Sequence, residues 1–271
     1  MKIAIYHNDN DHSVEVVDEL KTKILARDDA DIIFDDAHPD IVISVGGDGT
    51  LLSAFHAYEQ QLDHVRFIGV HTGHLGFYAD WQDFELDDLV NSLVHDSKES
   101  VEYPIVQANL FFTDQTQRTI LALNEIVIKR SFGTLSAIVD INGDYFERFR
   151  GDGLSIATPS GSTAYNKAVG GAVVSPSLEA MQLTEIGSIN NRVFRTLGSP
   201  VIMGASDVIS VKAPDAETDS VQVAYDTLHF VSEQIEKIEF KIAPTKIKFA
   251  KYRHMNFWQR IQTSFIGPEE K

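Results

Sequence analysis

The sequence predicts an α/β N-terminal domain, in which helices cover a parallel sheet, followed by a mostly β C-terminal domain. Strand-like and helix-like segments alternate through the first third of the chain, which is the rhythm of a parallel sheet. After Tyr103-Pro104 the apolar segments become short and are separated by turn residues. The segment Phe257–Ile266 is too apolar for a free tail and is expected to dock on the protein. We therefore place the domains at residues 1–102, 103–240 and 241–271, with the last segment packing on the first domain.

The elements of the first domain follow from the spacing of apolar residues. Helix-like segments carry them three or four positions apart, on one helical face, whereas strand-like segments are short apolar runs. In chain order, the expected elements are a strand at Lys2–Tyr6, a helix at Val14–Ala26, a strand at Ile41–Val45, a helix at Leu51–Gln60 and a strand at Arg66–Val70.

Most elements of the second domain are predicted to be strands. Asn142-Gly143 is a strong hairpin signal, because both residues accept the backbone angles that a tight turn requires. A helix around Ser162–Val169 interrupts the strands. The expected strands are Thr119–Ile128, Ser136–Ile141, Tyr145–Arg150, Val208–Ala213, Val221–Tyr225, Lys237–Ile242 and Lys246–Lys251.

Composition narrows the class of protein. The chain carries 23 basic and 40 acidic residues, a formal net charge of −17, which disfavours nucleic acid and anionic membranes as partners. It contains no cysteine, so neither a disulfide framework nor a thiolate metal site is possible. No window reaches the roughly 18 to 20 unbroken apolar residues of a membrane span, and the N-terminus lacks a signal-peptide pattern. We expect a cytoplasmic protein, in which a nucleotide site must build its own positive field.

A glycine-rich loop, Gly46-Gly47-Asp48-Gly49-Thr50, separates a buried strand from an amphipathic helix. Glycines let the backbone approach a ligand closely, and the N–H groups of a helix N-terminus suit phosphate. The loop has neither a Walker A ending nor the spacing of a Rossmann fingerprint. A turn without a ligand is the alternative, but a carboxylate set among glycines has no evident packing purpose. Asp48 is therefore the candidate to orient or deprotonate a hydroxyl in phosphoryl transfer. The competing role for Asp48, and for Thr50, is a helix N-cap.

A second glycine-rich block, Arg150–Lys167, brings small residues, hydroxyl groups, a carboxylate and an aromatic ring into a short segment. Such a run fits a polar ligand that lies against the backbone, with Tyr165 able to flank a base. The alternative is a long turn followed by a helix that Ser162 or Thr163 caps. The block alone does not decide between these readings.

Two adjacent polar residues, Asn124 and Glu125, lie inside the apolar strand predicted at Thr119–Ile128. Neighbouring side chains of a strand point to opposite faces, so at least one of the two faces the interior. An unpaired buried amide or carboxylate costs roughly 1–3 kcal/mol. A ligand hydroxyl or amide would satisfy such a group, and so would a neighbouring backbone group.

Together, these three motifs resemble those of one family. Gly46–Thr50, the pair Asn124-Glu125, and Gly151-Asp152-Gly153 followed by Thr158–Tyr165 are similar in order and spacing to the motifs of NAD kinases. The first loop is shared with diacylglycerol kinases, sphingosine kinases and phosphofructokinases, so the other two motifs make the resemblance specific. The segment His71–Phe77 is similar to a strand-end turn in the compact NAD kinases of Gram-positive bacteria.

The resemblance implies a reaction and the residues that perform it. The γ-phosphoryl group of ATP would pass to the 2′-hydroxyl of the adenosine ribose of NAD, which gives NADP and ADP. Asp48 would be the catalytic base, and the ATP phosphate loop would be Gly46, Gly47, Asp48, Gly49 and Thr50. The residues expected to bind NAD are Gly49, His74, Phe77, Asn124, Glu125, Arg150, Asp152, Ser160, Thr163, Ala164, Tyr165, Asn166, Lys167, Ala168, Gly187 and Asn191.

The resemblance also implies a cofactor and partners. Mg²⁺ would arrive on the ATP phosphates without dedicated protein ligands, and we interpret His71 and His74 as turn residues rather than metal ligands. Family members are typically homo-oligomers, here a tetramer or a dimer, in which Gly187 and Asn191 would lie near a neighbour's ligand. One departure is Asp226-Thr227, where many relatives have Asp-Gly. The use of NADH or polyphosphate and feedback by NADP stay open.

Two other functions compete with this one. A lipid kinase of the diacylglycerol or sphingosine type would need an apolar acceptor pocket and a membrane-facing basic or amphipathic surface. The net charge of −17 and the polar pair Asn124-Glu125 weigh against it. A non-catalytic nucleotide sensor could dispense with a carboxylate in the glycine loop, whereas this chain has Asp48.

Overall fold

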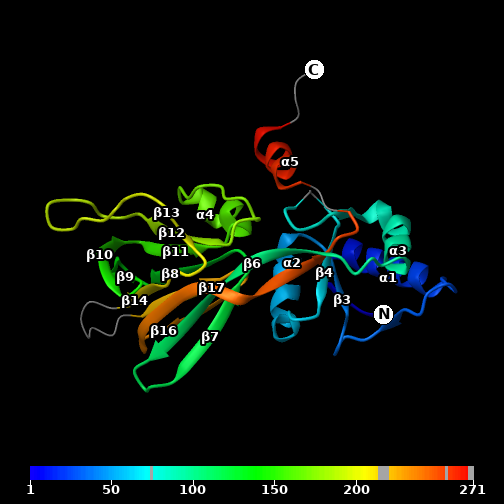
Figure 1. The fold of residues 1–271 in the computed structure, drawn as a ribbon, viewed down its shortest axis with the longest axis horizontal. Coiled ribbons are helices and arrows are strands. Elements are labelled where there is room, and N and C mark those ends of the chain that lie inside the picture. The colour runs from blue at the N-terminus through cyan, green and yellow to red at the C-terminus, as the bar shows by residue number, and fades with distance from the viewer. Residues whose placement is uncertain (74–75, 213–219, 254–255, 268–271) are drawn as a thin grey trace. The chain divides into compact units, whose positions relative to one another are not determined.

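The protein, seen in a computed structural model, is described for residues 1–73, 76–212, 220–253 and 256–267 (Figure 1). It divides into two compact units. The α/β unit consists of Met1–Glu102 and Lys246–Lys271, and the β unit consists of Tyr103–Thr245. His74 and Ala213, which belong to the sequence predictions, lie outside the described residues.

A parallel sheet forms the centre of the α/β unit. Its strands include β1 (Lys2–His7), β2 (Ile33–Phe34), β3 (Ile41–Val45), β4 (Arg66–His71) and β5 (Trp81–Gln82). The central strand β3 pairs in parallel with β1 and β4, while β2 pairs with β1 and β5 with β4. The strands predicted in this domain are confirmed, each to within one residue at its end.

Helices α1 (Asp11–Leu25), α2 (Asp48–Ala57) and α3 (Leu86–Val94) cover this sheet. Helix α1 begins at Asp11 rather than at Val14, because the Asn10 side chain accepts the His12 N–H and caps the helix. Apolar side chains of α1 and α3 share one core cluster with β3. Figure 1 shows α1 and α3 on one side of β3 and β4 and α2 on the other. Short 3₁₀ turns lie at Glu59–Gln61 and Asp83–Glu85.

The β unit contains two groups of antiparallel strands. One is a sheet in the order β13-β12-β11-β8-β15-β16, and in the other β10, β9, β14 and the first part of β17 pair in that order. The strand β6 pairs with β7. The strands are β6 (Ser100–Phe112), β7 (Gln117–Ala122), β8 (Glu125–Arg130), β9 (Leu135–Ile141), β10 (Asp144–Gly151), β11 (Gly153–Ala157), β12 (Ala180–Ile186), β13 (Val201–Gly204), β14 (Ile209–Lys212), β15 (Val221–Tyr225), β16 (Leu228–Ser232) and β17 (Ile235–Ala250).

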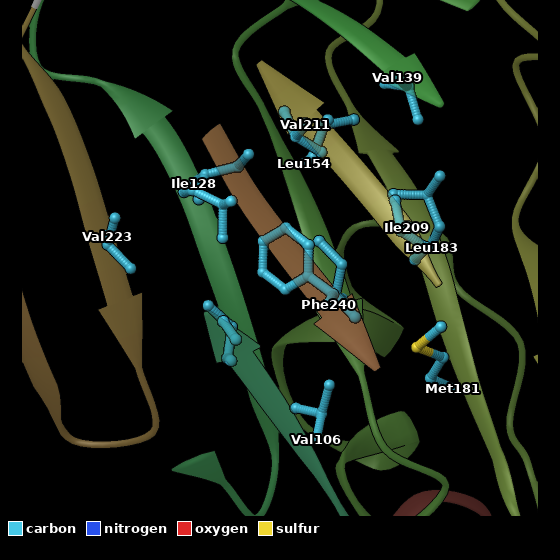
Figure 2. Packing of buried hydrophobic residues seen from close by; sticks show 14 of the residues in the cluster. Val106, Ile128, Val139, Leu154, Met181, Leu183, Ile209, Val211, Val223 and Phe240 are labelled. Atoms are coloured by element: carbon cyan, nitrogen blue, oxygen red, sulfur yellow. The ribbon is translucent and has the colours of Figure 1, made fainter. Parts of the chain in front are cut away.

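Apolar side chains from both groups of strands form one core in the β unit. Figure 2 shows the fully buried ring of Phe240 among side chains that include Ile128, Leu154 and Leu183. These come from β17, β8, β11 and β12, so the core ties the two groups together. Strand β8 pairs with β11 on one side and with β15 on the other. Glu125 is the first residue of β8.

The hairpin predicted at Asn142-Gly143 is confirmed between β9 and β10. Asn142 has φ 55° and Gly143 has φ 88°, the left-handed angles that a two-residue hairpin turn needs. With this hairpin and the parallel sheet in place, the fold class expected from the sequence is confirmed, and the C-terminal segment packs within the α/β unit. None of the helices within the described ranges has the length and apolar character that crossing a membrane requires.

Three strand predictions were wrong in their extent. The predicted strands Lys237–Ile242 and Lys246–Lys251 are parts of one strand, β17, which continues through Pro244 and ends at Ala250. Pro244 is exposed, and its fixed φ suits extended backbone, so the missing N–H does not end the strand. The strand predicted at Thr119–Ile128 is instead two strands, β7 and β8, separated by a bend at Leu123 and Asn124.

The helix predicted at Ser162–Val169 is shorter and less regular than expected. The segment forms a 3₁₀ turn at Ser160–Thr163 and a short helix, α4 (Tyr165–Ala168). The Ser162 hydroxyl accepts the Val174 N–H at 2.9 Å, so tertiary hydrogen bonds shape this segment in place of a long helical ladder. No side chain caps the 3₁₀ turn or α4, so the alternative in which Ser162 or Thr163 caps a helix was wrong.

Candidate functional site

The glycine-rich loop lies at the carboxyl end of β3, beside the same ends of β1 and β4. The Gly46 N–H donates to the Val70 carbonyl at 2.9 Å, which ties the loop to the end of β4. From the end of β1, the Asn8 side-chain amide donates to the Thr50 hydroxyl at 3.3 Å. In open α/β sheets, ligands bind outside the carboxyl ends of the strands. The loop therefore occupies the usual ligand edge of this sheet.

The three glycines of the loop differ in what requires them. Gly46 has φ +150°, and a Cβ there would overlap Thr50, so the fold itself needs glycine. A Cβ built at Gly47 or Gly49 would meet no atom within 4 Å, and neither residue has a positive φ. Both residues are exposed at the N-terminus of α2. Packing does not explain these two glycines, whereas close approach of a ligand to the backbone does.

Asp48 does not cap its own helix. The N-cap of α2 is Gly47, no side chain caps the helix, and Thr50 instead accepts from Asn8. The capping alternative for Asp48 and Thr50 was therefore wrong.

Instead, the Asp48 carboxylate reaches a second segment of the α/β unit. One oxygen accepts the Phe77 N–H at 2.8 Å and the other accepts the Tyr78 N–H at 3.1 Å. Gly76 lies so close that a Cβ on it would overlap the Asp48 carboxylate. Two backbone amides thus orient a half-buried carboxylate at the carboxyl end of the sheet.

The ring of Phe77 lies in an aromatic cluster with the C-terminal segment. Its centroid is 6.4 Å from that of Phe257, in α5 (Phe257–Ile261), and 5.6 Å from that of Phe265, in the π-helical turn Gln262–Ile266. Arg260 of α5 is buried and donates to the carbonyls of Gly76 and Ala79, which lie on either side of Phe77 and Tyr78 in the chain. The C-terminal segment therefore supports the residues that hold Asp48.

In the β unit, the break between β7 and β8 is held by a carboxylate from a distant hairpin. Asp226, in the turn between β15 and β16, accepts the Leu123 N–H at 2.8 Å and the Asn124 N–H at 2.7 Å. The Thr158 N–H donates to the Asn124 carbonyl at 2.9 Å, and the Thr158 hydroxyl donates to the Leu123 carbonyl at 2.6 Å. The backbone groups of the bend are thus satisfied from outside the strand.

Glu125 is a buried carboxyl group with an unsatisfied oxygen. It is 8% exposed, and its pKa is raised to about 8 by burial and by the nearby charge of Asp226, against a smaller opposing effect of the Asn166 N–H. Among the described residues, Oε2 of Glu125 has no hydrogen-bond partner. A carboxyl group with this pKa is mostly protonated at neutral pH and can both donate and accept. It can therefore pair with a hydroxyl of a ligand.

The second glycine-rich block lies directly against this bend. Gly161 packs so closely on Asn124 that a Cβ would overlap the Asn124 carbonyl. The Ser160 hydroxyl donates to the Leu123 carbonyl at 3.2 Å, and the Thr163 hydroxyl donates to the Ser160 carbonyl at 3.2 Å. Asn166 is fully buried and accepts from the Thr184 hydroxyl at 2.8 Å. Three predicted ligand residues thus have internal bonds that hold the block in place.

Tyr165 has a basic neighbour that the sequence analysis did not identify. The Lys129 ammonium donates to the Tyr165 hydroxyl at 2.7 Å and lies 4.8 Å from the centroid of its ring. Tyr165 and Ala164 are half-buried, while Lys167 and Ala168 are exposed on α4. The signal in the sequence was the position of Lys129 at the polar end of an otherwise apolar strand, four residues after Glu125.

A further group of predicted residues gathers around the end of β12. A Cβ on Gly187, which has φ +56°, would lie 2.6 Å from the Asp152 carboxylate. The Arg150 guanidinium lies 4.8 Å from the centroid of the Phe194 ring, and the Phe194 N–H donates to the Asn191 side chain at 2.9 Å. The structure thus brings together Arg150, Asp152, Gly187 and Asn191, all predicted ligand residues.

Comparison with known proteins agrees with this arrangement of motifs. Residues 5–98 match the family model of the ATP-NAD kinase N-terminal domain, and residues 123–251 match that of the ATP-NAD kinase C-terminal domain. The chain is 49% identical to an NAD kinase of Latilactobacillus sakei and 50% identical to one of Leuconostoc mesenteroides, each over 100% of both chains.

Solved structures share the fold. A yeast NADH kinase in complex with NADH has a TM-score of 0.82 at 20% identity, covering 100% of this chain and 89% of its own. An NAD kinase of Archaeoglobus fulgidus in complex with ATP has a TM-score of 0.71 at 23% identity, covering 93% and 94%. On the full-length matches to curated relatives and the matches to both family models, the chain belongs to the ATP-NAD kinase family, a family of phosphotransferases.

Proposed function

We propose that this chain transfers the γ-phosphoryl group of ATP to the 2′-hydroxyl of the adenosine ribose of NAD, with Asp48 as the general base. The observation that carries the proposal is the Asp48 carboxylate, oriented by the N–H groups of Phe77 and Tyr78 at the mouth of the glycine loop. The ribose O2′ attacks the γ-phosphorus, its proton passes to Asp48, and the bond to the bridging oxygen breaks. NADP and ADP are the products.

The ATP phosphates lie against the glycine loop in this proposal. Gly47 and Gly49 are exposed and have open space at their Cβ positions, which supports direct contact between backbone and phosphate oxygens. Gly46 packs closely on Thr50, and Thr50 accepts a hydrogen bond from Asn8, so these contacts fix the conformation of the loop. The net charge of −17 would repel the ATP phosphates. The partial positive charge at the N-terminus of α2 offsets this repulsion locally.

Mg²⁺ fits this site as an ion carried by ATP. Among the described residues, no group of three or more His, Asp or Glu side chains is arranged to hold a metal ion. Mg²⁺ commonly binds phosphate oxygens and keeps several waters, so it needs few protein ligands. The bound ion would neutralise charge on the phosphates, while the chain's own residues position the two substrates.

Asn124 and Glu125 hold the adenosine ribose in this proposal. The unpartnered oxygen of Glu125 supports it, because a ribose hydroxyl would satisfy a buried group that the described residues leave unpaired. Thr163, Ala164 and Tyr165 border the adenine in this proposal. Asp152 contacts the nicotinamide end, and Arg150 and Lys129 are basic groups close to these motifs.

We further propose that the protein acts in the cytoplasm as a homo-oligomer, with a tetramer favoured over a dimer. Gly187 and Asn191 are exposed, which supports their contact with the ligand of a neighbouring subunit. Size-exclusion chromatography with light scattering gives the number of subunits, and loss of the oligomer should be accompanied by loss of NAD binding.

A coupled assay of ADP release tests the function directly. The purified chain is given Mg²⁺-ATP with NAD, NADH or diacylglycerol as the acceptor, and an NADP-specific dehydrogenase identifies the product. We expect ADP release and NADP formation with NAD, and no ADP release with diacylglycerol. Tight NAD binding without ADP release from any acceptor would overturn the proposal in favour of a nucleotide sensor.

A further inference from the structure

Arg260 is a buried cation whose hydrogen bonds converge on one turn of the α/β unit. It is 3% exposed and comes from α5 in the C-terminal segment. Nη1 donates to the Gly76 carbonyl at 2.8 Å and to the Ala79 carbonyl at 2.9 Å, and Nη2 pairs with the Asp80 carboxylate. Burying a guanidinium is costly unless such partners are present, so its position is strongly specified.

The partners of Arg260 belong to the turn that holds Asp48. The Gly76 carbonyl and the Phe77 N–H are the two ends of a single peptide group. Arg260 donates to its oxygen at 2.8 Å, and its N–H donates to the Asp48 carboxylate at 2.8 Å. In a trans peptide these two groups point in opposite directions within the peptide plane, so Arg260 and Asp48 lie at opposite edges of the same peptide group.

This arrangement affects both the position and the strength of the contact to Asp48. A guanidinium on the carbonyl oxygen fixes the orientation of the peptide plane, and therefore the direction of the Phe77 N–H. Hydrogen bonds in a chain also polarise one another, so the cation strengthens the donation from this N–H to the carboxylate. Arg260 also donates to the Ala79 carbonyl. Ala79 follows Tyr78, whose N–H is the other donor to Asp48, so Arg260 binds the backbone both before and after the two donors.

We propose that Arg260 is a positioning residue for phosphoryl transfer, which orients Asp48 through the Gly76–Phe77 peptide group. This inference rests on the proposed role of Asp48 as the base. It gives the C-terminal segment a function in turnover that is separate from covering the ring of Phe77. The competing explanation is that Arg260 only docks the C-terminal segment.

A double-mutant cycle separates the two explanations. The kcat of NAD phosphorylation is measured for the full-length chain, for R260Q, for D48N and for the double variant. If Arg260 acts through Asp48, R260Q lowers kcat by about tenfold or more alone and by less than about twofold in the D48N background. Equal fold-losses in both backgrounds would overturn the proposal, because a docking role does not depend on Asp48.

A matched variant in the same segment completes the experiment. Arg253 is an exposed arginine of the C-terminal segment that pairs with Glu85. R253Q should keep kcat within about twofold of the parent, whereas a loss in R253Q equal to that in R260Q would indicate docking alone. If R260Q does not fold, R260K replaces it in the cycle, since lysine keeps the charge but lacks the planar fork. Normal turnover of D48N would instead refute the proposed base, and so identifies that separate failure.

Discussion

The Asn124 N–H donates to the Asp226 carboxylate at 2.7 Å, across a sequence separation of 102 residues. Asp226 has φ 49° and lies in the turn between β15 and β16. Its carboxylate accepts the N–H groups of Leu123 and Asn124 at the break between β7 and β8. The same charge helps to raise the pKa of Glu125 to about 8, after the larger effect of burial. One hairpin residue therefore controls both the placement of the Asn-Glu pair and the protonation of Glu125.

Replacing Asp226 with alanine should impair dinucleotide binding. The substitution removes two charge-assisted hydrogen bonds to the backbone of the bend, each worth roughly 1.5–3 kcal/mol. We expect the KM for NAD to rise about tenfold or more, which corresponds to about 1.4 kcal/mol, while the KM for ATP changes little. Steady-state kinetics with each substrate varied in turn measures both constants.

Asp114→Ala is the matched control for this variant. Asp114 is also a turn aspartate of the β unit, and it accepts the Thr116 N–H at 2.9 Å and the Thr116 hydroxyl at 2.6 Å. The control removes a similar set of bonds from a turn that contains no predicted ligand residue. If Asp114→Ala raises the KM for NAD as much as Asp226→Ala does, the specific role of Asp226 is lost.

Glu125→Gln should change how stability depends on pH. In the native state the pKa of Glu125 is about 8, above the 4.5 of a free glutamate, so the folded chain holds a proton that the unfolded chain has lost between these values. The stabilisation from Glu125 is complete below the unfolded pKa and falls as pH rises, by about 1.4 kcal/mol per pH unit, until the native pKa is passed. Glutamine, which does not titrate, removes this slope.

Urea unfolding from about pH 5 to about pH 9 measures the effect. The difference in unfolding free energy, parent minus Glu125→Gln, should decrease steadily across this window and level off at its upper end. Taking the difference cancels the contribution of the other titrating groups. Parallel curves for the two proteins would contradict a raised pKa at Glu125.

The glycines of the phosphate loop should respond differently to alanine. Gly49→Ala should leave folding intact, or stabilise α2 by roughly 0.5–1 kcal/mol, because alanine is favoured within a helix. It should raise the KM for ATP several-fold, because the methyl group enters the space where phosphate approaches the backbone. Gly46→Ala should instead destabilise the fold, since its φ of +150° and its contact with Thr50 both exclude a side chain.

Thermal unfolding and ATP kinetics on the two glycine variants give the answer. The KM for NAD of Gly49→Ala serves as the internal reference, as this loop faces the ATP phosphates in the proposed mechanism. An unchanged KM for ATP in Gly49→Ala would place the phosphates elsewhere.

Local patterns were sufficient for the parts of the fold that neighbouring residues determine. The strand Ile41–Val45, the loop Gly46–Thr50 and the hairpin at Asn142-Gly143 all follow from short stretches of sequence. The break at Leu123 and Asn124 does not, because the surrounding apolar residues read as one strand and the carboxylate that holds the break comes from Asp226.

The residues that orient Asp48 could not be predicted from the sequence either, because they also lie far from it along the chain. The sequence predicts Asp48 as the candidate reactive carboxylate, but the backbone donors to it lie about thirty residues away, and Arg260 is 184 residues from the Gly76 carbonyl it binds. An arginine in an amphipathic C-terminal segment reads as a surface residue, and only tertiary packing buries it. Lys129 escaped notice likewise, since its contact with Tyr165 spans 36 residues.

Asp48→Asn tests the central claim most directly, because it removes the basic oxygen and keeps the shape of the side chain. We predict that kcat for NAD phosphorylation falls by about 10²–10⁴, while the dissociation constant for NAD, measured by calorimetry, stays within about threefold of the parent. A variant with near-normal turnover would contradict Asp48 as the general base.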